Sequence, residues 1–408
     1  MQYVGRTVVR LHAQLIAAVS AILCCAPALA QNAETTRAAG SSAPAAYVYI
    51  SHTPENSSTN QIEAFRAAAN GQLTPIAGSP FREDVQTMAV NGRYMFAASS
   101  QTTDINTYKI DSNGALQYVT AIDYAQYNPD NAGGAGPLVL DHTGSSLYVL
   151  EYEAYDSNNI YSSFDVNSDG TLKYLGFVNV GAPSFGAPYL APSFVGYNVF
   201  AYTATDASDM YFSTTGLYRS SSHLLKSIQN FNVAMPAPPA DARIYYPQTA
   251  AADPGSHVAM TLQAENPPGA PVGTPVIVSF TAHGNGDLTT SNTSADMPAT
   301  EVTFANDLKM SPSGKLLAVG GTGGLQVFHF NGSEPATHYT PLLTTDTISL
   351  MFWDNCNHLY AITQSGAQPA PGKLYVFTIT PTGYTQAPGS PYTIFQPVSL
   401  TVQPLPLP

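Results

Sequence analysis

The sequence predicts an all-β protein made of repeated four-stranded antiparallel sheets. The first observation is a turn signature that occurs four times: Asn70-Gly71-Gln72-Leu73, Asn113-Gly114-Ala115-Leu116, Asp169-Gly170-Thr171-Leu172 and Asn285-Gly286-Asp287-Leu288. Asn-Gly and Asp-Gly are strong hairpin signals, because both central residues of a type I′ turn need positive φ. The glycines are spaced by multiples of roughly 50 residues, which is typical of a unit that repeats around a β-propeller.

The second observation is a set of strand pairs, each joined by a short turn. We label the strands of one sheet A to D, from the central channel outward. Six A–B pairs can be read from the alternation of apolar runs and turn residues: 88–90 with 94–97, 138–140 with 147–150, 193–195 with 199–202, 249–252 with 257–262, 308–310 with 316–319, and 350–353 with 358–362. Six pairs imply at least six sheets.

The two ends of the chain supply the seventh sheet. Residues 47–51 form a B-like strand with no A strand before it, and residues 397–402 form an A-like strand with no B strand after it. Pairing them closes the ring and removes exposed sheet edges. The prediction is a seven-bladed β-propeller over residues 46–408, closed by the C-terminal strand. Six or eight blades, or two separate sandwiches, are the alternatives.

The first thirty residues have the features of a secretory signal peptide. Arg6 and Arg10 form a basic segment, residues 15–25 an apolar segment, and Ala28-Leu29-Ala30 a small-residue cleavage site. We therefore expect removal of residues 1–30 and a periplasmic or extracellular protein.

Two alternatives concern the same segment. The apolar run is short for a membrane-spanning helix, and the residues before Cys24 and Cys25 are bulky for a lipid anchor. No membrane span is expected after cleavage. Residues 31–45 are rich in Ser, Ala and Thr, and we expect a disordered tether there.

The excess of acidic residues limits the kinds of molecule that the protein is expected to bind. The chain has 14 Lys and Arg residues against 27 Asp and Glu residues, and loss of Arg6 and Arg10 leaves 12 − 27 = −15. This disfavours nucleic acids and anionic membranes, which are bound through Lys and Arg. Only Cys356 remains after cleavage, so no intramolecular disulfide can form. We expect a monomer that binds a small polar molecule or an envelope protein.

Strand order places the B–C loops and D–A crossovers on one face, at the mouth of the channel, where ligands usually bind. Four residues there are candidates for catalysis. His52 follows the first B strand, Arg82 and Arg243 lie on D–A crossovers, and Glu151 follows the third B strand. Each arginine could bind an oxyanion of a ligand. Each could equally form an ion pair with the acidic residue beside it in the sequence, Glu83 for Arg82 and Asp241 for Arg243.

Acidic residues follow several B strands at the same mouth. They are Glu151, Glu153, Asp156, Asp206, Asp209 and Glu265. If they converge, their oxygens could hold Ca²⁺; otherwise they are ordinary solvated loop residues. No metal or cofactor motif is present, so no cofactor is predicted and the metal ligands are unknown. Outside the mouth, histidines such as His142 and His358 fall at A–B turns, where a structural role is expected.

Several short segments resemble the lactonase family of seven-bladed β-propellers, which includes bacterial 6-phosphogluconolactonase-like proteins. They are Tyr47-Val48-Tyr49-Ile50-Ser51, Asn70-Gly71-Gln72-Leu73-Thr74-Pro75, Ser79-Pro80-Phe81, Ser311-Pro312-Ser313-Gly314-Lys315 and Ser390-Pro391-Tyr392. The resemblance implies YVTN-type repeats and a channel site. That family carries Gly-Pro-Arg-His before an A strand, whereas this chain has Gly136-Pro137-Leu138-Val139. Lactone hydrolysis needs an oxyanion donor and a base, and both basic positions are apolar here.

Three functions follow from these features. The first is an exported, catalytically diverged lactonase-like propeller that binds a small polar ligand or an envelope partner at its mouth. The second is an exported lactone hydrolase acting on a sugar lactone, with Arg82 or Arg243 replacing the basic pair and Glu151 or His52 as base. The third is a structural envelope protein.

Overall fold

The computed structural model describes residues 43–99, 101–127, 134–141, 143–152, 159–179, 193–195, 199–206, 211–219, 223–231, 235–283, 288–363 and 370–405. The chain divides into two units, Met1–Thr35 and Thr36–Pro408. The first unit, with the expected signal peptide, lies outside the described residues. Ala45, at the end of the expected tether, is buried, and its N–H donates to the Ala67 carbonyl at 2.8 Å.

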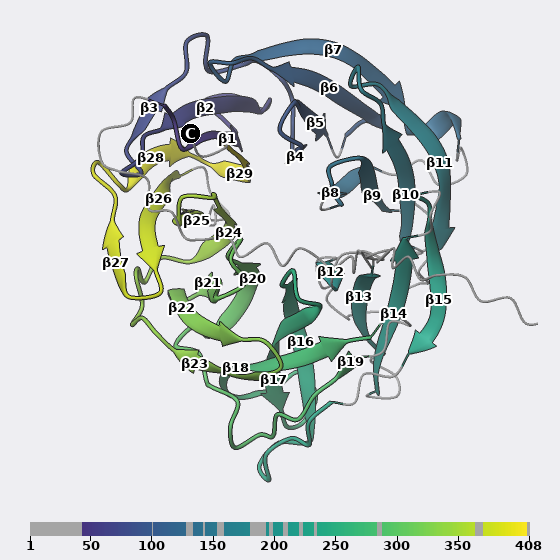
Figure 1. Ribbon diagram of the computed structural model, residues 1–408, viewed down its shortest axis with the longest axis vertical. Coiled ribbons are helices and arrows are strands. Elements are labelled where there is room, and N and C mark those ends of the chain that lie inside the picture. Colours follow the sequence, from purple (N-terminus) through teal and green to yellow (C-terminus); the bar gives the residue numbers. More distant parts are fainter. Residues whose placement is uncertain are drawn as a thin grey trace, which may run out of the picture. The chain divides into compact units, whose positions relative to one another are not determined.

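The second unit consists of antiparallel sheets, the blades, arranged as a ring. The A strand of each blade lies toward the centre (Figure 1). From the centre outward, blade 1 is β29 (Pro397–Pro404), β1 (Ala46–His52), β2 (Gln61–Ala67) and β3 (Leu73–Pro75); blade 2 is β4 (Thr87–Val90), β5 (Tyr94–Ala98), β6 (Asp104–Ile110) and β7 (Leu116–Asp123); blade 3 is β8 (Ala135–Leu140), β9 (Ser146–Tyr152), β10 (Asn159–Val166) and β11 (Leu172–Asn179); blade 4 is β12 (Ser193–Val195), β13 (Val199–Asp206), β14 (Tyr211–Arg219) and β15 (Leu225–Phe231).

Blade 5 is β16 (Ile244–Ala252), β17 (His257–Glu265), β18 (Pro271–Ala282) and β19 (Leu288–Thr289); blade 6 is β20 (Phe304–Met310), β21 (Leu316–Thr322), β22 (Gly324–Asn331) and β23 (Glu334–His338); blade 7 is β24 (Ile348–Trp353), β25 (His358–Thr363), β26 (Pro371–Thr380) and β27 (Gly383–Gln386), with β28 (Tyr392–Phe395) also paired to β26. A short 3₁₀ helix, η1 (Tyr124–Gln126), follows β7. The predicted all-β propeller is confirmed, and all six predicted A–B pairs occur.

The two ends of the chain meet in blade 1, as the sequence predicts. β29 runs antiparallel to β1, with Val48 opposite Val402 and Ile50 opposite Leu400. Leu400 and Val402 are buried in an apolar cluster that also contains Ile362 and other residues of blade 7. The C-terminal strand therefore closes the sheet and packs the seam between blades 7 and 1.

The repeated Asn-Gly and Asp-Gly turns occur between C and D strands, but they are not type I′ turns. At the first copy Gly71 has φ of +79°, and its N–H donates to the Ala68 carbonyl at 2.9 Å. Gly114 and Gly170 repeat this geometry, and among the described residues the Asn or Asp before each glycine has no positive φ. This is the three-residue loop in which a type I turn precedes a left-handed glycine. The fourth copy lies largely outside the described residues.

These turns also join neighbouring blades. The Tyr94 hydroxyl on β5 donates to the carbonyl of Ser168, which lies in the C–D turn of blade 3, at 3.0 Å. A Cβ added at Gly170 would lie 2.6 Å from the Tyr94 ring, so the turn needs glycine for close packing as well as for its φ of +88°. Tyr49 makes the same kind of bond to Gly114 at 2.8 Å. The repeated glycine turns in the sequence are therefore also the places where neighbouring blades contact each other.

The apolar core lies between the blades. One buried cluster joins blades 2 and 3 through residues such as Phe96, Leu147 and Phe164. Others join blades 1 and 2, 5 and 6, and 6 and 7. In the described part of the chain, no helix has the length and apolar character needed to cross a membrane.

Candidate functional site

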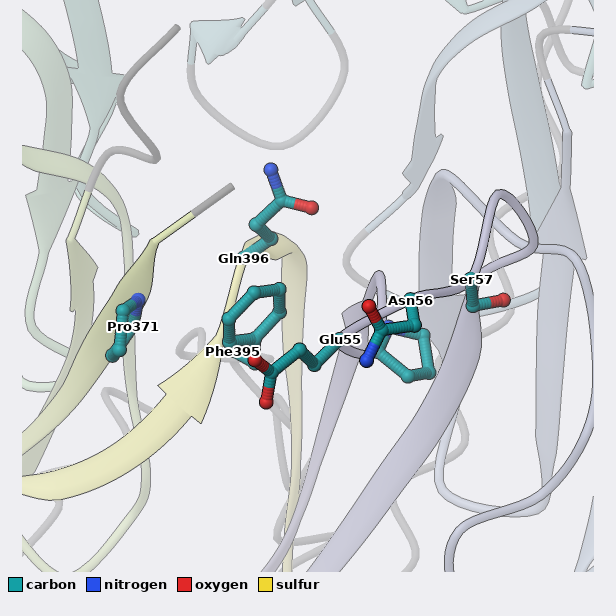
Figure 2. A pocket seen from close by; sticks show the side chains of 7 residues that line it. Glu55, Asn56, Ser57, Pro371, Phe395 and Gln396 are labelled. Atoms are coloured by element: carbon teal, nitrogen blue, oxygen red, sulfur yellow. The ribbon is translucent and has the colours of Figure 1, made fainter. Parts of the chain in front are cut away.

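A cleft of about 460 Å³ lies at the seam between blades 7 and 1 (Figure 2). Its walls come from three segments: the β1–β2 loop, the start of β26, and the β28–β29 crossover. The lining residues are Pro54, Glu55, Asn56, Ser57, Pro371, Phe395 and Gln396. The β1–β2 loop is a B–C loop, β26 starts where the B–C loop of blade 7 ends, and the β28–β29 segment is a D–A crossover. All three belong to the mouth face. The cleft therefore opens where the strand order predicts ligands to bind, and its volume suits a small molecule.

One backbone hydrogen bond joins the cleft's two main walls, and a second closes a turn within the β1–β2 loop. The Thr53 N–H donates to the Gln396 carbonyl at 3.1 Å, and the Ser57 N–H donates to the Pro54 carbonyl at 3.1 Å. Asn56 has φ of +63°, a left-handed conformation that asparagine tolerates better than most residues. The loop is thus a turn held to the crossover.

His52 ends β1, directly before the β1–β2 loop that lines the cleft. Its side chain is 5% exposed, and Nδ1 is 3.1 Å from the carbonyl oxygen of Phe395. Because a carbonyl only accepts, Nδ1 carries the proton in this bond. Nε2 is buried, has no hydrogen bond within the described residues, and lies 3.6 Å from Oε1 of Glu63 on β2. Burial raises the pKa of Glu63, and His52 partly opposes this shift.

The other three predicted catalytic residues do not join His52. Arg82 is exposed on the crossover from blade 1 to blade 2, and Arg243 is exposed on the crossover into blade 5. Glu151 lies near the end of β9 in blade 3 and is 1% exposed. Burial raises the pKa of Tyr124, and the Glu151 carboxylate raises it further. Within the described residues, no hydrogen bond or ion pair connects any two of these four side chains. The arginines likewise form no ion pair with Glu83 or Asp241 there.

The acidic residues proposed for Ca²⁺ are only partly described. Glu153, Asp156 and Asp209 lie outside the described residues, as does the side chain of Asp206. Glu265 accepts the Gly269 N–H at 2.7 Å and so closes its own loop. Among the described residues, no group of three or more His, Cys, Asp or Glu side chains could hold a metal ion.

The segment that replaces the family's basic pair contributes one residue, Leu138, to the core. Leu138 on β8 is 7% exposed and packs in the cluster between blades 2 and 3. Its N–H donates to the Thr87 hydroxyl of β4 at 3.3 Å. The position where the resemblance places an arginine thus holds an apolar side chain that stabilises the contact between blades.

The opposite face has a smaller pocket of about 270 Å³, formed by A–B turns of blades 2, 3 and 7 and the end of β29. Its acidic residue, Asp141, accepts the N–H groups of Ser145 and Ser146, each at 2.9 Å. In the neighbouring turn, the Asp354 carboxylate binds Nδ1 of His358 at 2.7 Å and the Tyr360 hydroxyl at 2.9 Å. The polar groups on this face therefore serve the turns, as expected for His358.

The sequence interpretation found the β1–β2 loop but missed the other wall. It named His52, whereas Phe395, Gln396 and the partly exposed Glu63 were not identified. Phe395-Gln396 directly precedes the closing strand, so the predicted closure was the signal that could have placed it opposite His52. Glu63 alternates with apolar residues on β2 and resembles an ordinary outward-facing glutamate.

Solved structures with similar folds include two proposed 6-phosphogluconolactonases. A proposed 6-phosphogluconolactonase of Bacteroides uniformis superposes with a TM-score of 0.62 at 14% identity, covering 88% of this chain and 99% of that one. A second, from Bacteroides fragilis, gives 0.62 at 12% identity, with 89% and 99% covered. A functionally unknown protein of Desulfotomaculum acetoxidans gives 0.51 at 10% identity, with 72% and 78% covered.

At these identities the likeness defines the fold, a lactonase-like β-propeller. No model of a known protein family matches the sequence, and no curated protein matches it either.

Proposed function

We propose that this protein is an exported, catalytically diverged propeller that binds a small polar ligand in the cleft between blades 7 and 1. One observation carries the proposal. The side chains of Glu55, Asn56 and Gln396 line the cleft and make no hydrogen bond or ion pair within the described part of the chain. Polar groups that the fold does not use, set around a cleft with apolar walls, are the arrangement of a binding site.

The alternative of lactone hydrolysis has weaker support. The fold is shared with proposed 6-phosphogluconolactonases, but fold alone does not carry chemistry. A hydrolase would need a base and an oxyanion donor around one substrate, and the four candidate residues come from separate places around the ring. Loss of one oxyanion donor commonly lowers the rate by roughly 10²–10³. We therefore expect turnover of gluconolactone no faster than its spontaneous hydrolysis.

An assay of the purified protein separates the two functions. Gluconolactone hydrolysis is followed above the spontaneous rate for the wild type, Arg82→Ala, Arg243→Ala and Glu151→Gln. Robust turnover that one of these substitutions abolishes would establish the enzyme and refute the binding proposal. Turnover that none of them alters would point to a contaminating lactonase, which the same purification from cells without this protein would expose.

A thermal-shift screen tests binding directly. Sugar lactones, sugar acids, polyols, amines and Ca²⁺ are each added to the wild type and to three variants. Glu55→Gln and Asn56→Ala change the cleft, whereas Glu334→Gln changes an exposed glutamate on the outer strand of blade 6. A ligand of the cleft should lose its shift in the cleft variants and keep it in Glu334→Gln. Shifts that are equal in all three variants would contradict binding at this site.

Export has its own test. The basic segment, apolar segment and cleavage site support removal of residues 1–30. Intact-mass analysis of protein from the native compartment should show an N-terminus at Gln31. Retention of residues 1–30, or a lipid mass on Cys24 or Cys25, would refute cleavage as proposed.

A further inference from the structure

We propose that the ligand of the cleft is an organic cation, an ammonium group with apolar substituents. This inference rests on the proposed function, because it names the chemical class of ligand for the same site. It follows from the charge of the lining residues, from their apolar surfaces, and from the ligand classes that this combination disfavours.

The cleft has one charged lining residue, and it is acidic. Glu55 is exposed on the β1–β2 loop, and no lysine or arginine lines the cleft. Within the described residues the Glu55 carboxylate has no ion-pair partner. Beside the cleft, the ionisable neighbour of His52 is a second carboxylate, that of Glu63. The site therefore offers negative potential to a ligand, and the chain's net charge of −13 reinforces it.

The remaining walls suit the apolar part of such a ligand. Phe395 presents an aromatic ring, and Pro54 and Pro371 supply rigid apolar surfaces. Figure 2 shows the Glu55 side chain extending toward Phe395, with Gln396 above them in this view. An aromatic face near a carboxylate is a favourable arrangement for an alkylammonium, because the ring attracts the cation while the carboxylate supplies the counter-charge.

Other ligand classes fit less well. A calcium ion takes six to eight oxygen ligands, whereas the cleft offers one carboxylate, and no group of three acidic or metal-binding side chains exists among the described residues. A sugar acid or phosphosugar would bring a negative charge to Glu55. A neutral polyol could bind Asn56 and Gln396, but its affinity would not depend on the charge at position 55.

Choline and its neutral isostere 3,3-dimethylbutan-1-ol form a matched pair of probes. Isothermal calorimetry at low salt should show choline binding at least tenfold more tightly than the isostere. Glu55→Gln should weaken choline about tenfold, Phe395→Leu should weaken it less, and Glu334→Gln should leave it unchanged. Raising the salt concentration should weaken binding, because the ion pair is partly exposed.

The outcomes distinguish this inference from the proposed function. Equal affinity for the two probes, or choline binding that Glu55→Gln leaves intact, would overturn the cationic class. Polyol binding that Asn56→Ala abolishes and Glu55→Gln does not would refute the cation and keep the binding site. If lactones, sugar acids, polyols and amines all fail to bind the correctly folded wild type, the proposed function and this inference fall together.

Discussion

The two faces of the propeller use similar polar residues in opposite ways. On the A–B face, Asp354 binds His358 and Tyr360, and Asp253 binds His257 at 2.9 Å. At the mouth, the side chains of Glu55 and Gln396 line a cleft and make no hydrogen bond or ion pair within the described residues. The first set lies within single turns, between residues four to six apart, whereas the second set comes from loops more than three hundred residues apart.

The difference shows where polar residues are structural and where they are free for a ligand. A short turn that begins a buried strand must satisfy its own N–H groups, so an Asp at its first position becomes part of the fold. A cleft assembled from two distant loops has no such need. A histidine or carboxylate in this protein is therefore informative about function only when its position in the blade is known.

Deleting residues 397–408 should have the largest effect, because β29 reaches both regions. It starts beside Gln396 at the cleft and ends with Gln403 and Pro404 at the pocket of the A–B face. Its removal exposes the edge of β1 and loses the burial of Leu400 and Val402, each contributing roughly 1.5–3 kcal/mol. That loss is a large part of an ordinary domain's stability, about 5–15 kcal/mol. We expect aggregated protein without cooperative thermal unfolding.

A shorter deletion serves as its control. Removing 406–408 leaves β29 whole, and this variant should fold with an unchanged melting temperature. If the longer deletion also stayed soluble with the wild-type melting temperature, ring closure by β29 would contribute nothing to stability.

The second effect compares a carboxylate on each face. Asp354 is fully buried and accepts four hydrogen bonds, from His358, Tyr360 and two backbone N–H groups. Asp354→Ala should lower the free energy of unfolding by about 3–5 kcal/mol, because the buried donors lose their acceptor. Glu55→Ala should change it by no more than about 0.5 kcal/mol. Equilibrium unfolding in urea measures both.

Comparable losses from the two substitutions would contradict the distinction between the faces. Asp354→Asn is the useful intermediate, because it keeps the shape and one acceptor. It should destabilise the protein less than Asp354→Ala.

Much of the fold could be predicted from the sequence, because the physics involved is local. A strand alternates with a period of two, a hairpin needs its turn residues, and the unmatched strands 47–51 and 397–402 must pair somewhere. The turn type was the error. Asn-Gly was interpreted as a two-residue loop, whereas Gly114 ends a three-residue loop whose Asn113 side chain accepts the Ala115 N–H at 3.1 Å. Both loops contain the same dipeptide, so composition does not distinguish them.

The sequence could predict which face of the propeller holds the site, but not which residues form it, because its walls depend on how the blades pack. His52 was placed at the mouth correctly, but its partner Glu63 lies on the neighbouring strand and Phe395 lies in another blade. Arg82, Arg243 and Glu151 all occupy positions on the mouth face, but they lie in different blades and do not form one site. Knowing that a loop is on a face does not say which of seven blades it meets.

A third effect concerns the contacts between blades. Tyr94→Phe removes the hydroxyl that donates to Ser168 at 3.0 Å. It should cost about 1 kcal/mol of unfolding free energy, the usual net value of one such bond. Tyr118→Phe is the matched control, since Tyr118 is 60% exposed on the outer strand β7. Equal stability of the two variants would show that this bond adds nothing to the joint between blades 2 and 3.

The smallest effect is a pH dependence beside the cleft. Nε2 of His52 lies 3.6 Å from Oε1 of the Glu63 carboxylate on β2. Burial raises the pKa of Glu63 above its ordinary value of 4.5. From that value up to the raised one, the folded protein binds more protons than the unfolded chain. Its stability should therefore fall as pH rises through this window.

Glu63→Gln tests this pH dependence, because a glutamine does not titrate. Urea unfolding of the wild type and of Glu63→Gln is measured in steps from pH 4 to pH 7, and the difference between the two curves isolates Glu63 from the other carboxylates. The wild type should lose stability relative to the variant as pH rises. His52→Gln should widen the window, since the histidine lowers the pKa of Glu63. A constant difference across the range would mean that Glu63 titrates alike in the folded and unfolded states.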